Sequence, residues 1–111
     1  MSKWRERYEN DQEFRERQIN NTYRARLKYL YGITFEEYEQ MLISQEGLCA
    51  VCRQKEVKIQ KGKIQRLSVD HDHITKQVRG LVCYNCNILI GHAKENPELL
   101  REAALYLERF L

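Results

Sequence analysis

Proline and glycine are scarce in this sequence, and long hydrophobic runs are absent. One proline and five glycines among 111 residues leave no low-complexity linker between domains. No apolar run approaches the roughly 18 residues needed to cross a bilayer, which argues against a transmembrane protein. The charged N-terminus is followed by no apolar segment of the kind found in secretion signals. We therefore expect a cytoplasmic chain without a membrane partner.

The composition is typical of one soluble globular domain. Hydrophobic residues make up 42% of the chain and charged residues 32%, which is too apolar for a fully disordered protein. The length fits a single compact core. A formal net charge of +3, from 19 basic and 16 acidic residues, is mildly basic and permits a polyanionic partner such as DNA.

The first thirty residues are highly charged and contain neither glycine nor proline. Their apolar side chains recur at helical spacing, which predicts a basic helical arm over residues 1–30 and a separate domain over residues 31–111. The arm either packs on the domain or on a second copy of it, or lies along nucleic acid. Its basic residues are Lys3, Arg5, Arg7, Arg15, Arg17, Arg24, Arg26 and Lys28.

Local signals in the rest of the chain predict an α+β fold. Thr34 and Glu37 have the spacing of a capping box, which predicts a helix over about residues 35–46 with Gly47 as the left-handed residue after it. Apolar alternation on both sides of Lys61-Gly62 predicts two strands and a turn within residues 57–69.

A further strand and two helices are expected towards the C-terminus. Residues 78–82 are typical of a strand, and residues 83–93 have helical character. Asn96 is predicted to cap a last helix that begins at Pro97. The apolar stripe of that helix is expected to form core or a dimer surface; it comprises Leu100, Ala103, Ala104, Leu107, Phe110 and Leu111.

The four cysteines form two pairs of identical spacing, Cys49-x-x-Cys52 and Cys83-x-x-Cys86. A turn of this kind presents two thiolates to one ion, and two such turns complete the tetrahedral site that zinc prefers. Four thiolates leave no open coordination position, so the predicted Zn²⁺ is structural. Two disulfides or free core thiols are the alternative, which a reducing cytoplasm disfavours.

Two of the three histidines fall in the segment Asp70-His71-Asp72-His73. A carboxylate can hold a hard cation such as Mg²⁺, and an imidazole can take a proton from an attacking water. Because a regular strand would direct Asp70 and His71 to opposite faces, the strand must bend or end there for them to share a site. A solvent-exposed polar turn or a second metal-binding cluster is the alternative.

Two further residues complete a candidate site for phosphodiester chemistry. Asn87 directly follows Cys86, and its amide oxygen offers a second ligand to a cation; the alternative is an ordinary polar or capping asparagine. Arg79 lies between the two cysteine pairs, and its guanidinium suits phosphate oxygens, with a surface salt bridge as the alternative.

These motifs together resemble the recombination endonuclease VII family of HNH nucleases over about residues 29–108. The resemblance runs from Tyr31-Gly32-Ile33-Thr34 through the cysteine pairs, residues 69–73 and residues 78–82 to Asn87 and Gly91. It implies a ββα-metal (HNH or His-Me finger) core around a structural zinc, flanked by helices, so residues 31–111 would form a zinc-stabilised HNH endonuclease domain.

The resemblance also implies site roles, by position. Asp70 and Asn87 would bind one catalytic Mg²⁺ or Mn²⁺, His71 would act as general base, and His73 would assist at the phosphate or the metal. Nucleases of this kind leave a 5′-phosphate and a 3′-hydroxyl, and many are encoded by bacteriophages. The helices at either end of the chain could form a homodimer.

One position departs from the family pattern. An acidic residue follows the motif asparagine in the namesake resolvase and helps its metal site, whereas this chain has Ile90. His92 could substitute but is expected to be a surface or capping histidine. Junction-resolving activity is therefore less strongly implied than nuclease chemistry.

Three functions are consistent with the sequence. The first is a metal-dependent DNA endonuclease. The second is a non-catalytic, zinc-containing nucleic-acid-binding module, which would have no need of Asp70, His71 and Asn87 together. The third is a protein-interaction domain built on the four cysteines, which leaves Asp-His-Asp-His unexplained.

Overall fold

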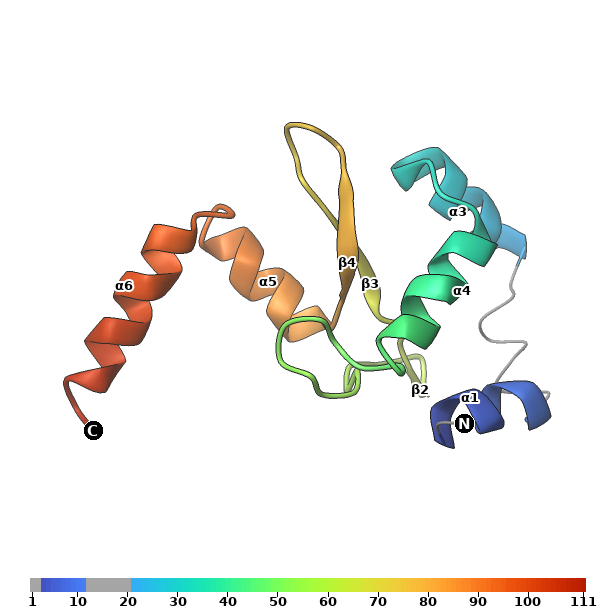
Figure 1. Cartoon of the computed structure of the whole chain (residues 1–111), viewed down its shortest axis with the longest axis horizontal. Helices are drawn as coiled ribbons and strands as arrows, with labels where there is room; N and C mark the ends of the chain where they lie inside the picture. The colour runs from blue at the N-terminus through green and yellow to red at the C-terminus, as the bar shows by residue number, and fades with distance from the viewer. Residues whose placement is uncertain (1–2, 12–20) are drawn as a thin grey trace.

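The computed structural model of the chain describes residues 3–11 and 21–111 and has the α+β fold expected (Figure 1). Arg15 and Arg17 of the predicted arm lie outside the described residues. The helices are α1 (Lys3–Asn10), α3 (Asn21–Tyr31), α4 (Phe35–Ser44), α5 (Tyr84–His92) and α6 (Pro97–Glu108). The strands form two antiparallel pairs, β1 (Ile59–Gln60) with β2 (Lys63–Ile64) and β3 (Ser68–His71) with β4 (Val78–Val82).

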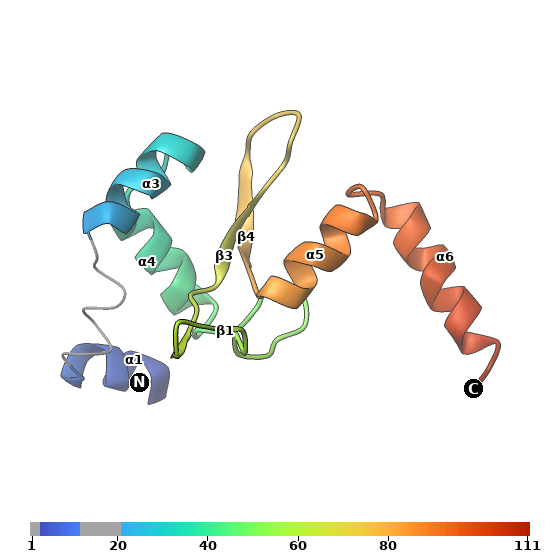
Figure 2. The same ribbon diagram turned by 180° about the vertical axis from the view of Figure 1, so that it is seen from behind.

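The β3–β4 hairpin lies at the centre of the molecule. Helices α3 and α4 lie on one side of it and α5 lies on the other (Figures 1 and 2). Helix α4 contacts β4 and α5 contacts β3. Helix α6 extends away from this core, and α1 and α6 lie towards opposite ends of a molecule 48 Å long.

The core connects α3, α4 and the central hairpin. The predicted capping box at the start of α4 is confirmed, because the Thr34 hydroxyl accepts the Glu37 N–H and the Glu37 carboxylate accepts the Thr34 N–H, each at 3.1 Å. Tyr38 is fully buried and donates its hydroxyl to the Leu67 carbonyl at 2.9 Å. Leu27 of α3 is also fully buried. Helix α3 thus crosses residue 30, and the division of the chain there stays a prediction.

Helix α4 ends earlier than the sequence suggested. It stops at Ser44, and Glu46 rather than Gly47 is the first left-handed residue, with φ of 54°. The Gly47 N–H then reaches back to the Leu42 carbonyl at 3.0 Å, which is the 6→1 bond of a Schellman motif. A β-carbon on Gly47 would overlap the ring of Trp4, so this glycine gives α1 its place against the core.

The two hairpins differ in strand length and in burial. The turn between β1 and β2 has Lys61 and Gly62 at φ of 53° and 76°, the backbone of a type I′ turn, which confirms the predicted turn. Its strands pair only two residues each and are exposed, so the alternation that predicted longer strands mostly belongs to irregular chain. By contrast, Val69 in β3 and Leu81 in β4 are buried partners.

The caps predicted for the last helix are confirmed, but its apolar stripe is not core. The Asn96 side chain accepts the N–H groups of Glu98 and Leu99, and Pro97 is the first helical residue. No residue of α6 is buried. Leu107 and Phe110 are 64% and 73% exposed, because the helix projects away from the body of the molecule.

Candidate functional site

The four cysteines converge on one point beside the start of α5. All are free thiols, and their sulfur atoms lie within 4.8 Å of one another. The Sγ atoms of Cys52 and Cys83 are 3.8 Å apart. A regular tetrahedron of sulfurs at about 2.3 Å from zinc has an edge of about 3.8 Å. The cluster therefore fits a structural zinc, and the disulfide alternative is not what the structure contains.

Backbone hydrogen bonds and burial act in opposite directions on the thiols of this cluster. Cys83 is the N-cap of α5, and its sulfur accepts the Cys86 N–H at 3.4 Å. The Cys49 sulfur accepts the Val51 N–H at the same distance. Burial opposes ionisation of Cys49, but N–H groups in the two cysteine turns outweigh it and lower the Cys49 pKa to about 7. Burial raises the pKa of Cys86 above its usual value.

Gln45 attaches the first cysteine turn to the central hairpin. Its side-chain amide donates to the Leu81 carbonyl at 2.9 Å and accepts the Leu81 N–H at 3.0 Å, as a neighbouring strand would. The Ala50 N–H also donates to the Leu81 carbonyl. These hydrogen bonds therefore attach the cysteine cluster to strand β4.

Glu56 is a structural residue that the sequence reasoning missed. It is the buried charged residue of the described core, with 8% exposure. One carboxylate oxygen accepts the N–H groups of Val57 and Lys58, and the other accepts the Tyr84 N–H at 2.8 Å. It thereby satisfies a free N–H in the first turn of α5. No spacing rule links positions 56 and 84, so no sequence signal marked it.

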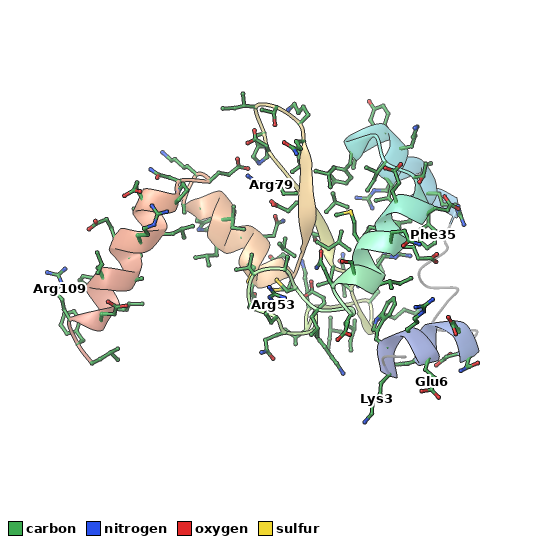
Figure 3. The ribbon with its side chains drawn as sticks, viewed as in Figure 1. Lys3, Glu6, Phe35, Arg53, Arg79 and Arg109 are labelled. Atoms are coloured by element: carbon green, nitrogen blue, oxygen red, sulfur yellow. The ribbon has the colours of Figure 1, made fainter. Side chains whose placement is uncertain are left out.

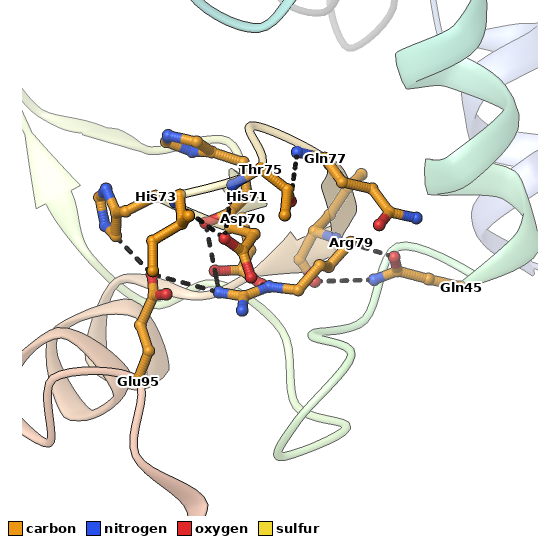
Figure 4. A network of polar contacts seen from close by, with 11 residues as sticks. Gln45, Asp70, His71, His73, Thr75, Gln77, Arg79 and Glu95 are labelled. Carbon is orange, nitrogen blue, oxygen red and sulfur yellow. Dashed lines mark hydrogen bonds and ion pairs between the residues drawn. The ribbon is translucent and has the colours of Figure 1, made fainter.

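A second cluster lies on the β3–β4 hairpin and centres on Arg79 (Figure 4). Asp70 pairs with Gly80 and His71 pairs with Val78, so Arg79 is an extra residue in β4 and the register shifts there. Such a bulge redirects a side chain. The irregularity lies between Asp70 and His71, at the point where the sequence analysis required the strand to bend or end.

Arg79 holds Asp70 in a two-point ion pair. Its Nε donates to Asp70 Oδ2 at 2.8 Å and its Nη2 donates to Oδ1 at 2.9 Å. The Asp70 side chain is 13% exposed and that of Arg79 is 37% exposed. The hydrogen bond to Asp70 raises the pKa of Arg79 above its usual value. Arg79 lies near the centre of the molecule, far from Arg109 at the end of α6 (Figure 3).

Glu95 joins this cluster from the loop after α5 and was not expected from the sequence. Its Oε1 accepts from Arg79 Nη2 at 3.4 Å and lies 3.1 Å from His73 Nε2 (Figure 4). Glu95 has a left-handed φ of 57°, and its N–H bonds to the Ile90 carbonyl. This helix end orients Glu95 towards the hairpin, which local sequence does not reveal.

His71 and Asp72 have different surroundings. The His71 ring lies 5.3 Å from the Tyr31 ring and 5.0 Å from the His73 ring, measured between centroids. The Asp72 carboxylate instead accepts the N–H groups of Ile74 and Thr75, and these bonds lower its pKa. Asp72 therefore closes the turn, in line with the polar-turn alternative for that one residue.

Comparison with known proteins places the chain in a family. A family model described as recombination endonuclease VII matches residues 24–109. The chain belongs to the recombination endonuclease VII family. It is also 40% identical over 98 residues to the Gene 59 protein of Mycobacterium phage D29, and 41% identical over 96 residues to that of Mycobacterium phage L5. These matches cover 87% and 86% of this chain but only 56% of each relative, so the chain spans about half the length of these curated relatives.

The matched region contains both clusters, and α5 connects them. Asn87 lies on α5 immediately after Cys86, and its N–H bonds to the Cys83 carbonyl. Its side chain is exposed, and within residues 3–11 and 21–111 the structure gives it no hydrogen bond to Asp70 or His71. Helix α5 does contact β3, the strand of Asp70.

The position at which this chain departs from the recombination endonuclease VII pattern is close to Glu95. Ile90 is half-buried on α5, and His92 is exposed in the last turn. The Ile90 carbonyl holds the backbone of Glu95, whose carboxylate reaches the hairpin cluster. The carboxylate of Glu95, in the loop after α5, thus contacts the hairpin cluster. In the described part of the chain, no helix is long and apolar enough to span a membrane.

Proposed function

We propose that this chain is a metal-dependent DNA endonuclease domain with a ββα-metal core of the HNH type. One observation carries the proposal. A hairpin bearing Asp70 and His71 leads through Cys83 into helix α5, which bears Cys86 and Asn87 and contacts β3. The order strand, strand, helix gives an acid, an imidazole and an amide from adjoining elements. Membership of the recombination endonuclease VII family supports a nuclease role in recombination.

Asp70 and Asn87 are the residues that would hold one Mg²⁺ or Mn²⁺, since carboxylate and amide oxygens suit a hard cation. In the structure both carboxylate oxygens of Asp70 accept hydrogen bonds from Arg79. When bound, the cation would stabilise negative charge on the phosphate and on the leaving oxygen. Asp70 must first release Arg79.

The remaining residues act on water and on the phosphate. His71, the general base, takes a proton from the attacking water on an imidazole nitrogen. Arg79, once released from Asp70, donates its N–H groups to phosphate oxygens. His73 is held at its Nε2 by Glu95 and assists at the edge of the site. The four-thiolate zinc has no open position and serves to hold α5 in place.

The second candidate is a non-catalytic, zinc-containing nucleic-acid-binding module. The two-point pair between Arg79 and Asp70 favours it, because that pair uses the carboxylate on which cation binding depends. The exposed Asn87 side chain favours it too. In this case the hairpin would be a fixed surface and no bond in the DNA would be hydrolysed.

A nicking assay on supercoiled plasmid separates the two candidates. Zinc-loaded protein is incubated with Mg²⁺ or Mn²⁺, and zinc content is measured on the same sample. We expect nicking by the native chain and none by His71→Ala, with the melting curve unchanged. His92→Ala, at an exposed histidine outside both clusters, is the matched control and should nick normally. Equal nicking by His71→Ala would refute the assignment of the base, and no nicking by the native chain would favour the binding module.

The proposal includes two statements about context. The relatives are phage proteins, so we place the activity in the cytoplasm of a phage-infected cell. We also propose a homodimer through α6, because the side chains of its apolar stripe are exposed in the single chain. Sedimentation of the native chain and of Leu107→Glu would test this, with a monomeric native chain counting against it.

A further inference from the structure

A cavity of about 260 Å³ lies next to the hairpin cluster and shares none of its polar residues. It is open to solvent on one side and is bordered by α3, the β1–β2 hairpin, the start of β3 and the first residue of α5. Its floor includes Leu27, Leu67 and Val69, which are buried. Its walls carry three tyrosines and three basic side chains: Tyr23, Tyr31, Tyr84, Arg26, Lys58 and Arg66.

The tyrosines and cations of the walls are arranged in pairs. The Arg66 guanidinium lies 4.1 Å from the centre of the Tyr23 ring, and the Lys58 ammonium lies 3.6 Å from the centre of the Tyr84 ring. Glu56 also borders the cavity, but both of its oxygens accept backbone N–H groups. The cavity is therefore positively charged overall. A ligand that stacks on the Tyr23 or Tyr84 ring takes the face that the cation leaves open or displaces that cation.

Tyr31 connects this cavity to the proposed active site. It lines the cavity, and its ring also lies 5.3 Å from that of His71. Val69, in the cavity floor, is two residues before His71 on the same strand. A ligand in the cavity would thus be next to a phosphate bound at the hairpin near His71.

We propose that this cavity is a subsite for one unpaired nucleotide next to the phosphate held at the hairpin. The proposal rests on the proposed function in taking a nucleic-acid strand as the ligand and the hairpin as the place of its phosphate. Aromatic faces accept a nucleobase of any kind by stacking, and basic side chains meet its phosphate. A duplex is too wide to enter a cavity of this size, so the base that occupies it must first leave its stack.

Binding of a short fluorescein-labelled single strand, followed by anisotropy without added divalent cation, tests the subsite. The same strand annealed to its complement is the comparison. We expect the native chain to bind the single strand more tightly than the duplex. Arg26→Gln and Tyr84→Leu should each weaken single-strand binding by about fivefold.

Helix α3 offers a matched control for each variant. Lys28→Gln removes a charge from the same helix as Arg26, and Tyr29→Leu removes an aromatic ring that is 89% exposed; neither residue lines the cavity. Both controls should change binding by less than about twofold, the scatter expected of exposed positions. Melting curves of all four variants confirm folding.

The outcomes separate this inference from the proposed function. Equal effects of Arg26→Gln and Lys28→Gln, or a duplex bound as tightly as its single strand, would overturn the subsite even if the plasmid is nicked. Binding that depends on Arg26 and Tyr84 would support the subsite even if no nicking occurs, and the endonuclease proposal alone would then fail.

Discussion

The ion pair between Arg79 and Asp70 leads to a prediction about cation binding. Arg79→Gln removes the guanidinium that competes for Asp70, so it should tighten Mn²⁺ binding while it slows plasmid nicking. Both effects follow from one side chain, because Arg79 blocks the carboxylate in the free protein and contacts the phosphate in the proposed complex.

The size of the effect follows from the exposure of the pair. The geometry is two-point, with distances of 2.8 and 2.9 Å, which is the stronger kind of ion pair. The Arg79 side chain is 37% exposed, so solvent screening reduces the gain to the upper end of values for surface pairs, about 1 kcal/mol. Removing that competition should lower the Kd for Mn²⁺ by about fivefold.

Free Mn²⁺ can be counted by electron paramagnetic resonance during titration of zinc-loaded protein. Arg53→Gln is a matched control, because Arg53 is an exposed arginine in the first cysteine turn and outside the hairpin cluster (Figure 3). Unchanged or weaker Mn²⁺ binding by Arg79→Gln would refute the competition and favour Arg79 as a permanent structural partner of Asp70.

Two further predictions concern stability. Cys86→Ser should lose zinc and unfold the domain, since the ion contributes folding energy directly; a folded, zinc-free variant in a melting and metal-content measurement would contradict this. Glu56→Gln should lower the free energy of unfolding by about 1–3 kcal/mol, because its amide nitrogen would face a backbone N–H donor. Glu102→Gln, on the exposed α6, is the control in the same denaturant titration, and equal stability of the two variants would show that the Glu56 bonds are dispensable.

The sequence predicted the features that depend on short spacing. A capping box needs only Thr34 and Glu37, and a zinc turn needs only two cysteines three positions apart, so both could be found without knowing the fold. The strand at residues 78–82 was also predicted from its apolar pattern, but its pairing with residues 68–71 was not.

Features that join distant elements were not predictable in the same way. Glu95 reaches His73 and Arg79 because two left-handed residues, Lys94 and Glu95 itself, follow α5 and turn the chain towards the hairpin. Glu56 reaches Tyr84 across 28 positions. The apolar period of α6 was read correctly as a helix, but the same period is compatible with a buried face or with an exposed one.

The carboxylates around Arg79 lead to a last prediction, which concerns how tightly the hairpin binds DNA without a cation. Asp70, Asp72 and Glu95 all act on this one guanidinium. With Lys76 in the turn of the same hairpin, these three acids leave one surplus negative charge when the histidines are neutral. We therefore expect the hairpin to repel a phosphate in the absence of a cation and to accept one more readily when a cation is bound.

Asp70→Asn tests this balance. It should abolish nicking, yet it should tighten DNA binding when no divalent cation is added. Two unit charges about 6 Å apart in solvent-like surroundings interact by about 0.7 kcal/mol, which is about threefold in Kd. Release of Arg79 towards the phosphate acts in the same direction. Anisotropy with labelled duplex DNA measures the change, and Glu102→Gln on α6 removes the same charge far from the hairpin. If Asp70→Asn bound no more tightly than that control, repulsion by the acidic hairpin would not be what a cation relieves.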